Sequence, residues 1–96
     1  MELTEALDAV QDAESFLVFA RLLIEDREHA AQLEGKGPKL PYGVYANGWA
    51  NSTVEAFLDA AIRWAEDSTF GKAQGLAADN PWKQFAVFLY CGKMYE

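Results

Sequence analysis

The single histidine is the first residue whose type and spacing suggest chemistry. His29 lies in the segment EDREHAA, four residues after Glu25 and three after Asp26. On a helix, either pair could hold a metal ion on one face. A stable site needs three or four ligands, and the sequence has no second cluster of His or Cys to complete it. The spacing therefore favours a solvated, charged helix end, and we expect no metal.

The other candidate groups predict no catalysis. Cys91, between Tyr90 and Gly92, is typical of a small buried hydrophobe rather than a nucleophile. None of the serines has a histidine beside it in sequence, and the segment GKGPK lacks the spacing and the Lys-Ser/Thr ending of a phosphate-binding loop. Most carboxylates fall on helix faces that are predicted to be exposed to solvent. Nothing there would raise the pKa of a carboxyl group, as a general acid requires. We expect a non-enzymatic protein with no cofactor.

The charge is concentrated in the first third of the chain. Residues 1–34 carry nine acidic and two basic side chains, whereas residues 35–96 carry six of each, for a total of −7. Such a surface repels nucleic acids and anionic membranes and attracts basic proteins. We therefore expect a basic protein partner and neither nucleic acid nor membrane. The alternative is that the acidic residues only keep the domain in solution.

Size and composition predict one domain spanning residues 1–96. Its 96 residues are 51% hydrophobic, which is enough for one core. Unbroken apolar runs such as residues 16–20 fall far short of the roughly 20 residues of a membrane span. The N-terminus is acidic where a secretory signal would be basic, and the lone cysteine fits a reducing compartment. These features predict a soluble cytoplasmic protein.

Periodicity and capping residues predict an all-α bundle of three or four helices. A short helix is expected over residues 3–10 with Thr4 as its N-cap, and a long one from Asp12 to about residue 33. The long helix is apolar over so much of its circumference that we expect it to be central, with neighbours on two sides. Arg27 continues its apolar spacing. Asn80 as N-cap and Pro81 at the first position predict the final helix.

The middle helix has the strongest periodic signal. Ser52 and Glu55 form a predicted capping box at its start. The residues expected to face the core are Val54, Phe57, Leu58, Ala61, Ile62 and Ala65. Phe70 and Leu76 are expected to anchor the loop that follows, and Trp82 is expected in the core.

Residues 35–51, GKGPKLPYGVYANGWAN, connect the long and middle helices. Two prolines and four glycines exclude a long regular element. The segment is unusually aromatic for a solvated linker, so we expect an ordered loop lying on the helices, with a short β-hairpin as the alternative; Asn47-Gly48 favours a tight turn in either case. Trp49 is expected to pack on the helix that follows it.

Two stretches together resemble a small bacterial family of unknown function. These are WANSTVEAFLDAAIRWAED, residues 49–67, and PWKQFAVFLYCGKMYE, residues 81–96. The matching positions are Trp49, Asn51, Thr53, Val54, Phe57, Leu58, Trp64, Asp67, Trp82, Tyr95 and Glu96. The resemblance implies a compact, mainly helical domain in which Asn51 or Ser52 caps the middle helix and Tyr95-Glu96 docks on the core. It implies no activity.

Three hypotheses about function follow. The first is a non-enzymatic protein-binding module, immunity-like or regulatory, that holds a basic partner. The second is a small-molecule or enzyme site in the aromatic segment 42–51, and the third is a homo-oligomer formed through the apolar face of residues 16–24. The candidate partner or ligand surface consists of Tyr42, Tyr45, Trp49, Asn51, Glu5, Asp8 and Asp12.

Overall fold

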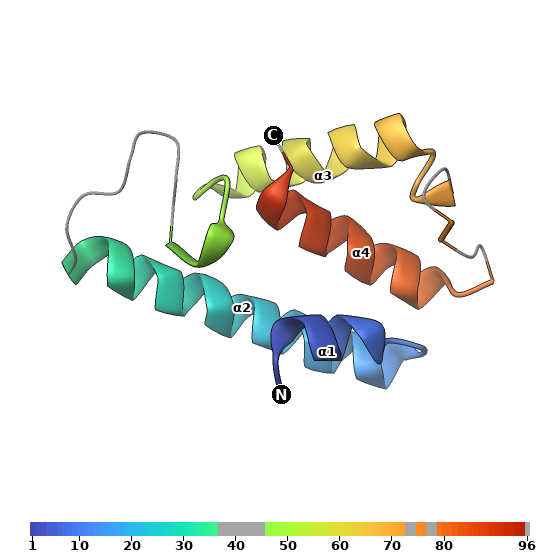
Figure 1. Ribbon diagram of the computed structural model, residues 1–96, viewed down its shortest axis with the longest axis horizontal. Helices are drawn as coiled ribbons and strands as arrows, with labels where there is room; N and C mark the ends of the chain where they lie inside the picture. The colour runs from blue at the N-terminus through green and yellow to red at the C-terminus, as the bar shows by residue number, and fades with distance from the viewer. Residues whose placement is uncertain (37–45, 73–74, 77–78, 96) are drawn as a thin grey trace.

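The computed structural model describes residues 1–36, 46–72, 75–76 and 79–95. In chain order the elements are α1 (Leu3–Asp8), α2 (Ala13–Lys36), the 3₁₀ turn η1 (Ala46–Gly48), α3 (Val54–Ser68) and α4 (Pro81–Met94). The described residues contain no strand, so the predicted all-α bundle is confirmed (Figure 1). The choice between a hairpin and a loop concerns residues 37–45, which lie outside the described part.

The central helix is α4, which lies between α2 and α3 (Figure 1). It packs along α3 on one side and against α2 and α1 on the other. The expectation that the long helix α2 would be central is therefore wrong. Gly92 makes the α3–α4 approach possible, because a Cβ there would lie only 3.0 Å from the backbone oxygen of Phe57.

The core lies where α1, α2 and α4 meet the segment around η1. Its buried members are Ala6, Val10, Phe19, Leu23, Ala30, Trp49 and Ala86. Phe19 and Val10 are its largest fully buried side chains. Three of the seven are alanines, whose small side chains let the helices approach closely. No helix in the described ranges has both the length and the apolar character needed to cross a membrane.

The predicted N-caps of α2 and α4 are confirmed, whereas those of α1 and α3 are wrong. The carboxylate of Asp12 accepts the N–H of Ser15 (2.9 Å), and the side chain of Asn80 accepts that of Lys83 (3.1 Å). At α1 the N-cap is Glu2 rather than the predicted Thr4. At α3 the N-cap is Thr53 rather than the predicted Ser52.

Thr53 caps α3, so the predicted capping box at Ser52 is wrong, as is capping by Asn51. The hydroxyl of Thr53 accepts the N–H of Ala56 (3.2 Å). A hydroxyl or carboxylate at this position satisfies a backbone donor that has no partner within the helix. Ser52 comes one residue too early to do so.

Replacing Thr53 by Ala should therefore lower the free energy of unfolding by about 1 kcal/mol. Ser52→Ala, the matched control, should change it by less than about 0.5 kcal/mol, because Ser52 is exposed and lies outside the helix. Urea denaturation of both variants measures the difference. An equal loss of unfolding free energy for the two variants, or a larger loss for Ser52→Ala, would show that Ser52 is the N-cap.

The loop after α3 is anchored by Phe70, one of the two predicted anchors. Thr69 and Phe70 both take positive φ, which turns the chain sharply out of the helix. The Phe70 ring stacks on Phe88 of α4, with centroids 5.5 Å apart, and meets Trp64 edge-on at 5.8 Å. Leu76 lies beside Gly71 of the same loop, and its backbone N–H donates to the carbonyl of Gly71 (3.0 Å), so anchoring to the helices is confirmed for Phe70 alone.

In three helices, the side that faces the core differs from the one predicted from the sequence. In α3 the stripe Val54, Leu58 and Ile62 was expected in the core but is exposed, because α4 packs on a neighbouring side that carries Ala60, Ala61, Trp64 and Ser68. Trp82 was also expected in the core, yet it is 38% exposed. Leu17, Val18 and Ile24 of α2 are exposed as well. The domain thus keeps considerable apolar surface open to solvent.

Candidate functional site

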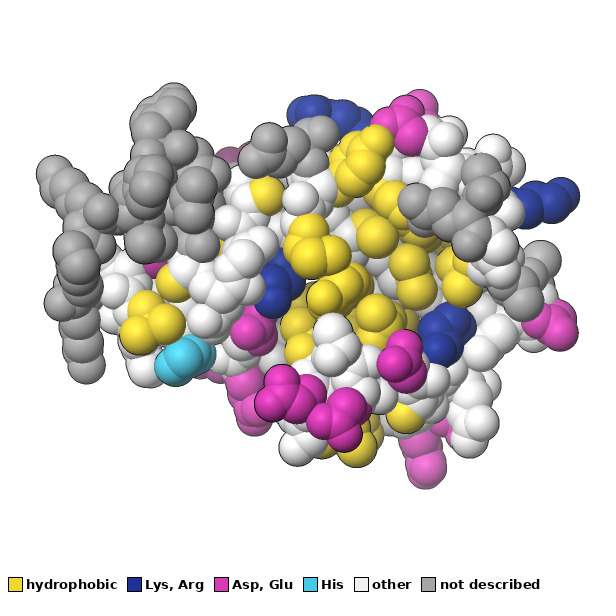
Figure 2. All heavy atoms as spheres, viewed as in Figure 1, with side chains coloured by type: hydrophobic (Ala, Val, Ile, Leu, Met, Phe, Trp, Pro, Cys, Tyr) yellow, Lys and Arg dark blue, Asp and Glu magenta, His cyan; other side chains and the backbone are white. Residues whose placement is uncertain are grey.

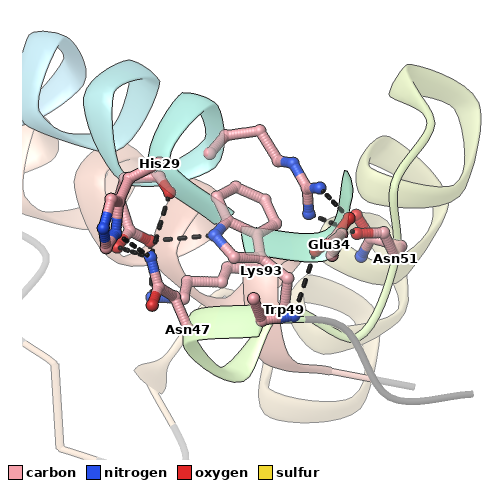
Figure 3. A network of polar contacts seen from close by, with 9 residues as sticks. His29, Glu34, Asn47, Trp49, Asn51 and Lys93 are labelled. Carbon is pink, nitrogen blue, oxygen red and sulfur yellow. Dashed lines mark hydrogen bonds and ion pairs between the residues drawn. The ribbon is translucent and has the colours of Figure 1, made fainter. Parts of the chain in front are cut away.

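Trp49 is held in a polar clamp between α2 and the end of α4. Its indole N–H donates to Oδ2 of Asp26 (2.8 Å), and Nζ of Lys93 donates to the same oxygen (2.7 Å) (Figure 3). Trp49 is 5% and Lys93 7% exposed. The Arg27 guanidinium lies 5.2 Å and the Lys93 ammonium 5.6 Å from the indole centroid, so two cations attract the ring. These residues form what we call the Trp49 clamp: Asp26, Arg27, Trp49 and Lys93.

Glu34 extends the clamp to the segment that precedes Trp49. One carboxylate oxygen accepts from Arg27 (2.6 Å), and the other accepts the backbone N–H of Ala46 (3.0 Å). Arg27 also donates to the carbonyl of Asn51 (3.3 Å). The last turns of α2 therefore hold the chain on both sides of Trp49.

Asn51 fixes the end of α4. Its side-chain N–H donates to the carbonyl of Gly92 (2.7 Å), and the backbone N–H of Ala50 donates to the carbonyl of Lys93 (2.8 Å). The last carbonyls of a helix have no partner within it, so these bonds satisfy groups that would otherwise be left unpaired. Asn51 is buried, and it is therefore part of the framework rather than of an exposed surface.

His29 is exposed and contacts the η1 turn. Its Nδ1 lies 3.1 Å from the amide nitrogen of Asn47, which also donates to the carbonyl oxygen of Asp26 (3.3 Å) (Figure 3). Asn47 and Gly48 both have positive φ, as the predicted tight turn requires. Among the described residues, no three His, Cys, Asp or Glu side chains gather as a metal ion would need. The contacts of His29 and Asp26 instead stabilise the turn before Trp49.

A groove of about 370 Å³ opens beside the clamp, between α2 and α3. Its lining is almost wholly apolar and comes from Leu23, Ile24, Trp49, Val54 and Phe57, with Arg27 and Glu28 at one edge and Ser52 and Thr53 at another. The indole of Trp49 packs against Phe57, with ring centroids 5.9 Å apart, which confirms that it packs on the following helix. We call this feature the α2–α3 groove.

The acidic members of the predicted surface lie away from this groove. Glu5 and Asp8 are exposed on α1, and Asp12 directly precedes α2. The backbone N–H of Ser15, followed by its hydroxyl, lowers the pKa of Asp12 by hydrogen bonding to the carboxylate. Figure 2 shows acidic side chains gathered over α1, beside hydrophobic side chains over α4. None of the three lines the α2–α3 groove.

The aromatic members are divided between the clamp and the part of the chain outside the described residues. Tyr42 and Tyr45 lie in segment 37–45, outside the described part. Trp49 is buried but lines the groove. At the C-terminus, the hydroxyl of Tyr95 bonds to the carboxylate of Asp67, which ties the end of the chain to α3. Glu96 lies outside the described residues.

Sequence reasoning missed the clamp itself. The sequence pattern pairs Asp26 only with His29 and predicts no role for Lys93. A signal existed for the two cations: Arg27 continues the apolar spacing of α2, and Lys93 follows Ala86 by seven residues on α4. A cation placed on an apolar helix side needs a carboxylate or an aromatic ring nearby.

Cys91 gives a pH-dependent prediction. Burial raises the pKa of this thiol to about 11. Because only the thiolate is alkylated, iodoacetamide at pH 8 should modify the folded protein about 200-fold more slowly than an ordinary thiol of pKa ~8.5. Unfolding in urea should restore the ordinary rate. Mass spectrometry measures the alkylation rate. Equal alkylation rates for the folded and the unfolded protein would contradict this expectation.

The fold and its clamp define a small all-α domain in which residues 46–51 are fastened to α2 and to the end of α4. Residues 12–96 match a family of unknown function (DUF7660), and the chain belongs to that family. The resemblance seen in the sequence is thereby confirmed. Comparison with curated proteins gives no match, and neither does comparison with solved structures.

Proposed function

We propose that this domain is a non-enzymatic protein-binding module that holds a basic partner protein in the cytoplasm. The observation that supports it is the apolar surface left open beside a well-packed core. Ile24 is 59% and Val54 71% exposed, although both line the same groove. Exposed apolar side chains that gather on one face commonly mark a site of protein association. The net charge of −7 supports a basic partner.

The groove favours a protein over a small molecule. A volume of about 370 Å³ is within the range of ligand pockets, roughly 300–1,000 Å³. Such pockets enclose most of their ligand and place several polar groups against it. Here Val54 and Ile24 project from the edges into solvent, and the apolar surface continues along α3 through Leu58 and Ile62. An immunity-like role, neutralising a basic toxin, and a regulatory role both fit this mode of binding.

A capture experiment tests the proposal. The immobilised protein is exposed to an extract of its native cells, and captured proteins are identified, purified and titrated by calorimetry. We expect a partner that is retained by the wild type and lost with the double variant Ile24→Ser/Val54→Ser. Affinity should fall as sodium chloride rises from 50 to 300 mM, because the attraction to a basic partner is screened.

Leu33→Ser provides the matched control. Leu33 is 46% exposed on α2, like the groove residues, but it does not line the groove. The control should retain the partner at wild-type affinity. If no purified protein distinguishes the wild type from the double variant, the proposal is wrong.

A further inference from the structure

We infer that two copies of this protein form a symmetric dimer through the side of the helical layer that faces away from α1. In that layer α4 lies between α2 and α3, and α1 packs against α2 and α4 from one side (Figure 1). The other side carries exposed apolar side chains from all three helices, and we call it the open face. Its members are Leu17 and Ile24 of α2, Val54, Leu58 and Ile62 of α3, and Phe85 of α4.

The groove residues define which sides of α2 and α3 belong to the open face. Ile24 and Val54 both line the α2–α3 groove. Leu17 precedes Ile24 by seven residues, or two helical turns, and therefore lies on the same side of α2. Leu58 and Ile62 follow Val54 at intervals of about one turn along α3. They continue the apolar surface beyond the groove and are not part of its lining.

Contacts with the start of the chain mark the opposite side of the layer. On α2, Leu22 and Glu25 line a hollow together with residues 1–3. On α4, Nζ of Lys83 donates to the carbonyl of Asp8 at the end of α1 (2.7 Å). Phe85 follows Lys83 by two residues, which is about 200° around the helix, so it lies on the other side of α4. The open face is thus the side that α1 does not cover.

The apolar area of the open face is sufficient for a dimer. Its six members are between 42% and 71% exposed. Large apolar residues offer about 150–250 Å² each when fully open, so together the six expose on the order of 550 Å². A standard interface buries about 800 Å² on each partner and is about 65% apolar in homodimers, which corresponds to roughly 500 Å² of apolar surface. A second copy therefore fits the size of the face.

Charge determines how the two copies are arranged. Arg21 is exposed one turn before Ile24 on α2, and Glu55 is exposed directly after Val54 on α3. Because α2 and α3 run in opposite directions, and Ile24 and Val54 meet at the groove, Arg21 and Glu55 lie at similar levels on opposite edges of the open face (Figure 1). A two-fold axis that runs along α4 places α2 of one copy over α3 of the other. Each Arg21 then meets the Glu55 of the other copy.

The other symmetric arrangement is disfavoured by the same charges. A two-fold axis that runs across the helices places α2 over α2 and α3 over α3, because an isologous interface joins identical surfaces. The two Arg21 side chains then approach each other, as do the two Glu55 side chains, and like charges in contact repel. The axis along α4 is therefore the one we assign. Since Ile24 and Val54 also line the groove, a second copy competes with the partner of the proposed function, although the dimer does not depend on that function.

Charge-reversal variants test the dimer and its arrangement. Sedimentation of the full chain is measured from about 5 to 500 µM, where we expect the wild type to pass from monomer to dimer. Arg21→Glu and Glu55→Arg each bring like charges together, so each should weaken association about tenfold. The double variant Arg21→Glu/Glu55→Arg restores opposite charges and should associate about as strongly as the wild type. Glu25→Arg is the matched control, and it should not change association because Glu25 lies on the side near residues 1–3.

A second pair of variants tests the apolar surface. Leu58→Ser/Ile62→Ser should also weaken association about tenfold, because it removes apolar contacts without changing the lining of the groove. Leu33→Ser should have no effect, since Leu33 follows Ile24 by nine residues and lies on the opposite side of α2. Far-ultraviolet circular dichroism confirms that each variant is folded.

The inference is wrong if the wild type stays monomeric at 500 µM, or if Leu58→Ser/Ile62→Ser associates like the wild type. If the two single charge variants associate as strongly as the wild type, Arg21 does not meet Glu55 and the arrangement is overturned. The proposed function is tested separately, because Arg21→Glu leaves the groove lining unchanged and should still retain the captured partner. A monomeric protein that captures its partner leaves the proposed function standing and removes only the dimer.

Discussion

Replacing Asp26 by Ala is expected to lower the free energy of unfolding by about 3 kcal/mol. The carboxylate accepts hydrogen bonds from the indole of Trp49 and from the buried ammonium of Lys93. Its removal leaves a cation at a site that is 7% exposed without its anionic partner. Urea denaturation at pH 7, monitored by circular dichroism, measures the loss.

The Asp59–Arg63 pair supplies the control for this prediction. Both side chains are more than half exposed, at 58% and 56%, so Asp59→Ala should cost less than about 0.5 kcal/mol. The double variant Asp26→Leu/Lys93→Met removes both charges and should recover more than half of the loss, since well-packed apolar residues often replace a buried ion pair without penalty. Similar losses for Asp26→Ala and Asp59→Ala would contradict the role given to the clamp.

The second large effect is expected at Trp49. Trp49→Ala should lower the free energy of unfolding by about 4 kcal/mol, because it removes a 5%-exposed indole from between α2, α3 and the end of α4. Trp49→Phe keeps most of the ring but loses the N–H that Asp26 accepts, and should cost about 1–2 kcal/mol. Denaturant unfolding of both variants provides the measurement.

Trp82 is the matched control among the tryptophans. Its ring packs on Phe16 at 5.5 Å, yet 38% of the residue is exposed. Since less area is buried, Trp82→Ala should cost about half as much as Trp49→Ala. If Trp82→Ala proves the more damaging change, the core has been placed at the wrong end of the domain.

Local rules predicted the helices better than their exact starts. Asn80 and Pro81 identify the start of α4 because capping needs only residues that are adjacent in the chain. At α3 two adjacent hydroxyl residues, Ser52 and Thr53, both satisfy the capping rule. The structure selects Thr53, two residues after Asn51, whose side chain is fixed by the carbonyl of Gly92. That anchor lies 41 residues away in sequence, so no local pattern could reveal it.

The facing of α3 shows a second limit of the sequence. The helix has two adjacent apolar sides, one through Val54 and Leu58 and one through Phe57 and Trp64. Periodicity indicates that α3 is amphipathic but does not decide which side meets a neighbour. The close fit of Gly92 against Phe57 decides it, and that contact depends on how α4 is placed. The groove could not be predicted for the same reason.

The Trp49 clamp could be predicted from the sequence only in part. The spacing of Arg27 and Lys93 within apolar helix sides was readable from the sequence, whereas their partners were not. Lys93 meets Asp26 across 67 residues, and Asn47 meets the same residue across 21. Such pairings arise only when the helices are packed, because they join segments that share no local signal.

We propose that the domain keeps the α2–α3 groove apolar for a partner and not for its own folding. The most direct test is the free energy of unfolding of Ile24→Ser/Val54→Ser, measured alongside its affinity for the partner. We expect the unfolding free energy to stay within about 1 kcal/mol of the wild type, as for exposed positions, and the affinity to be at least tenfold weaker. A loss of several kcal/mol, as core residues give, would show that these side chains serve folding and would contradict the account.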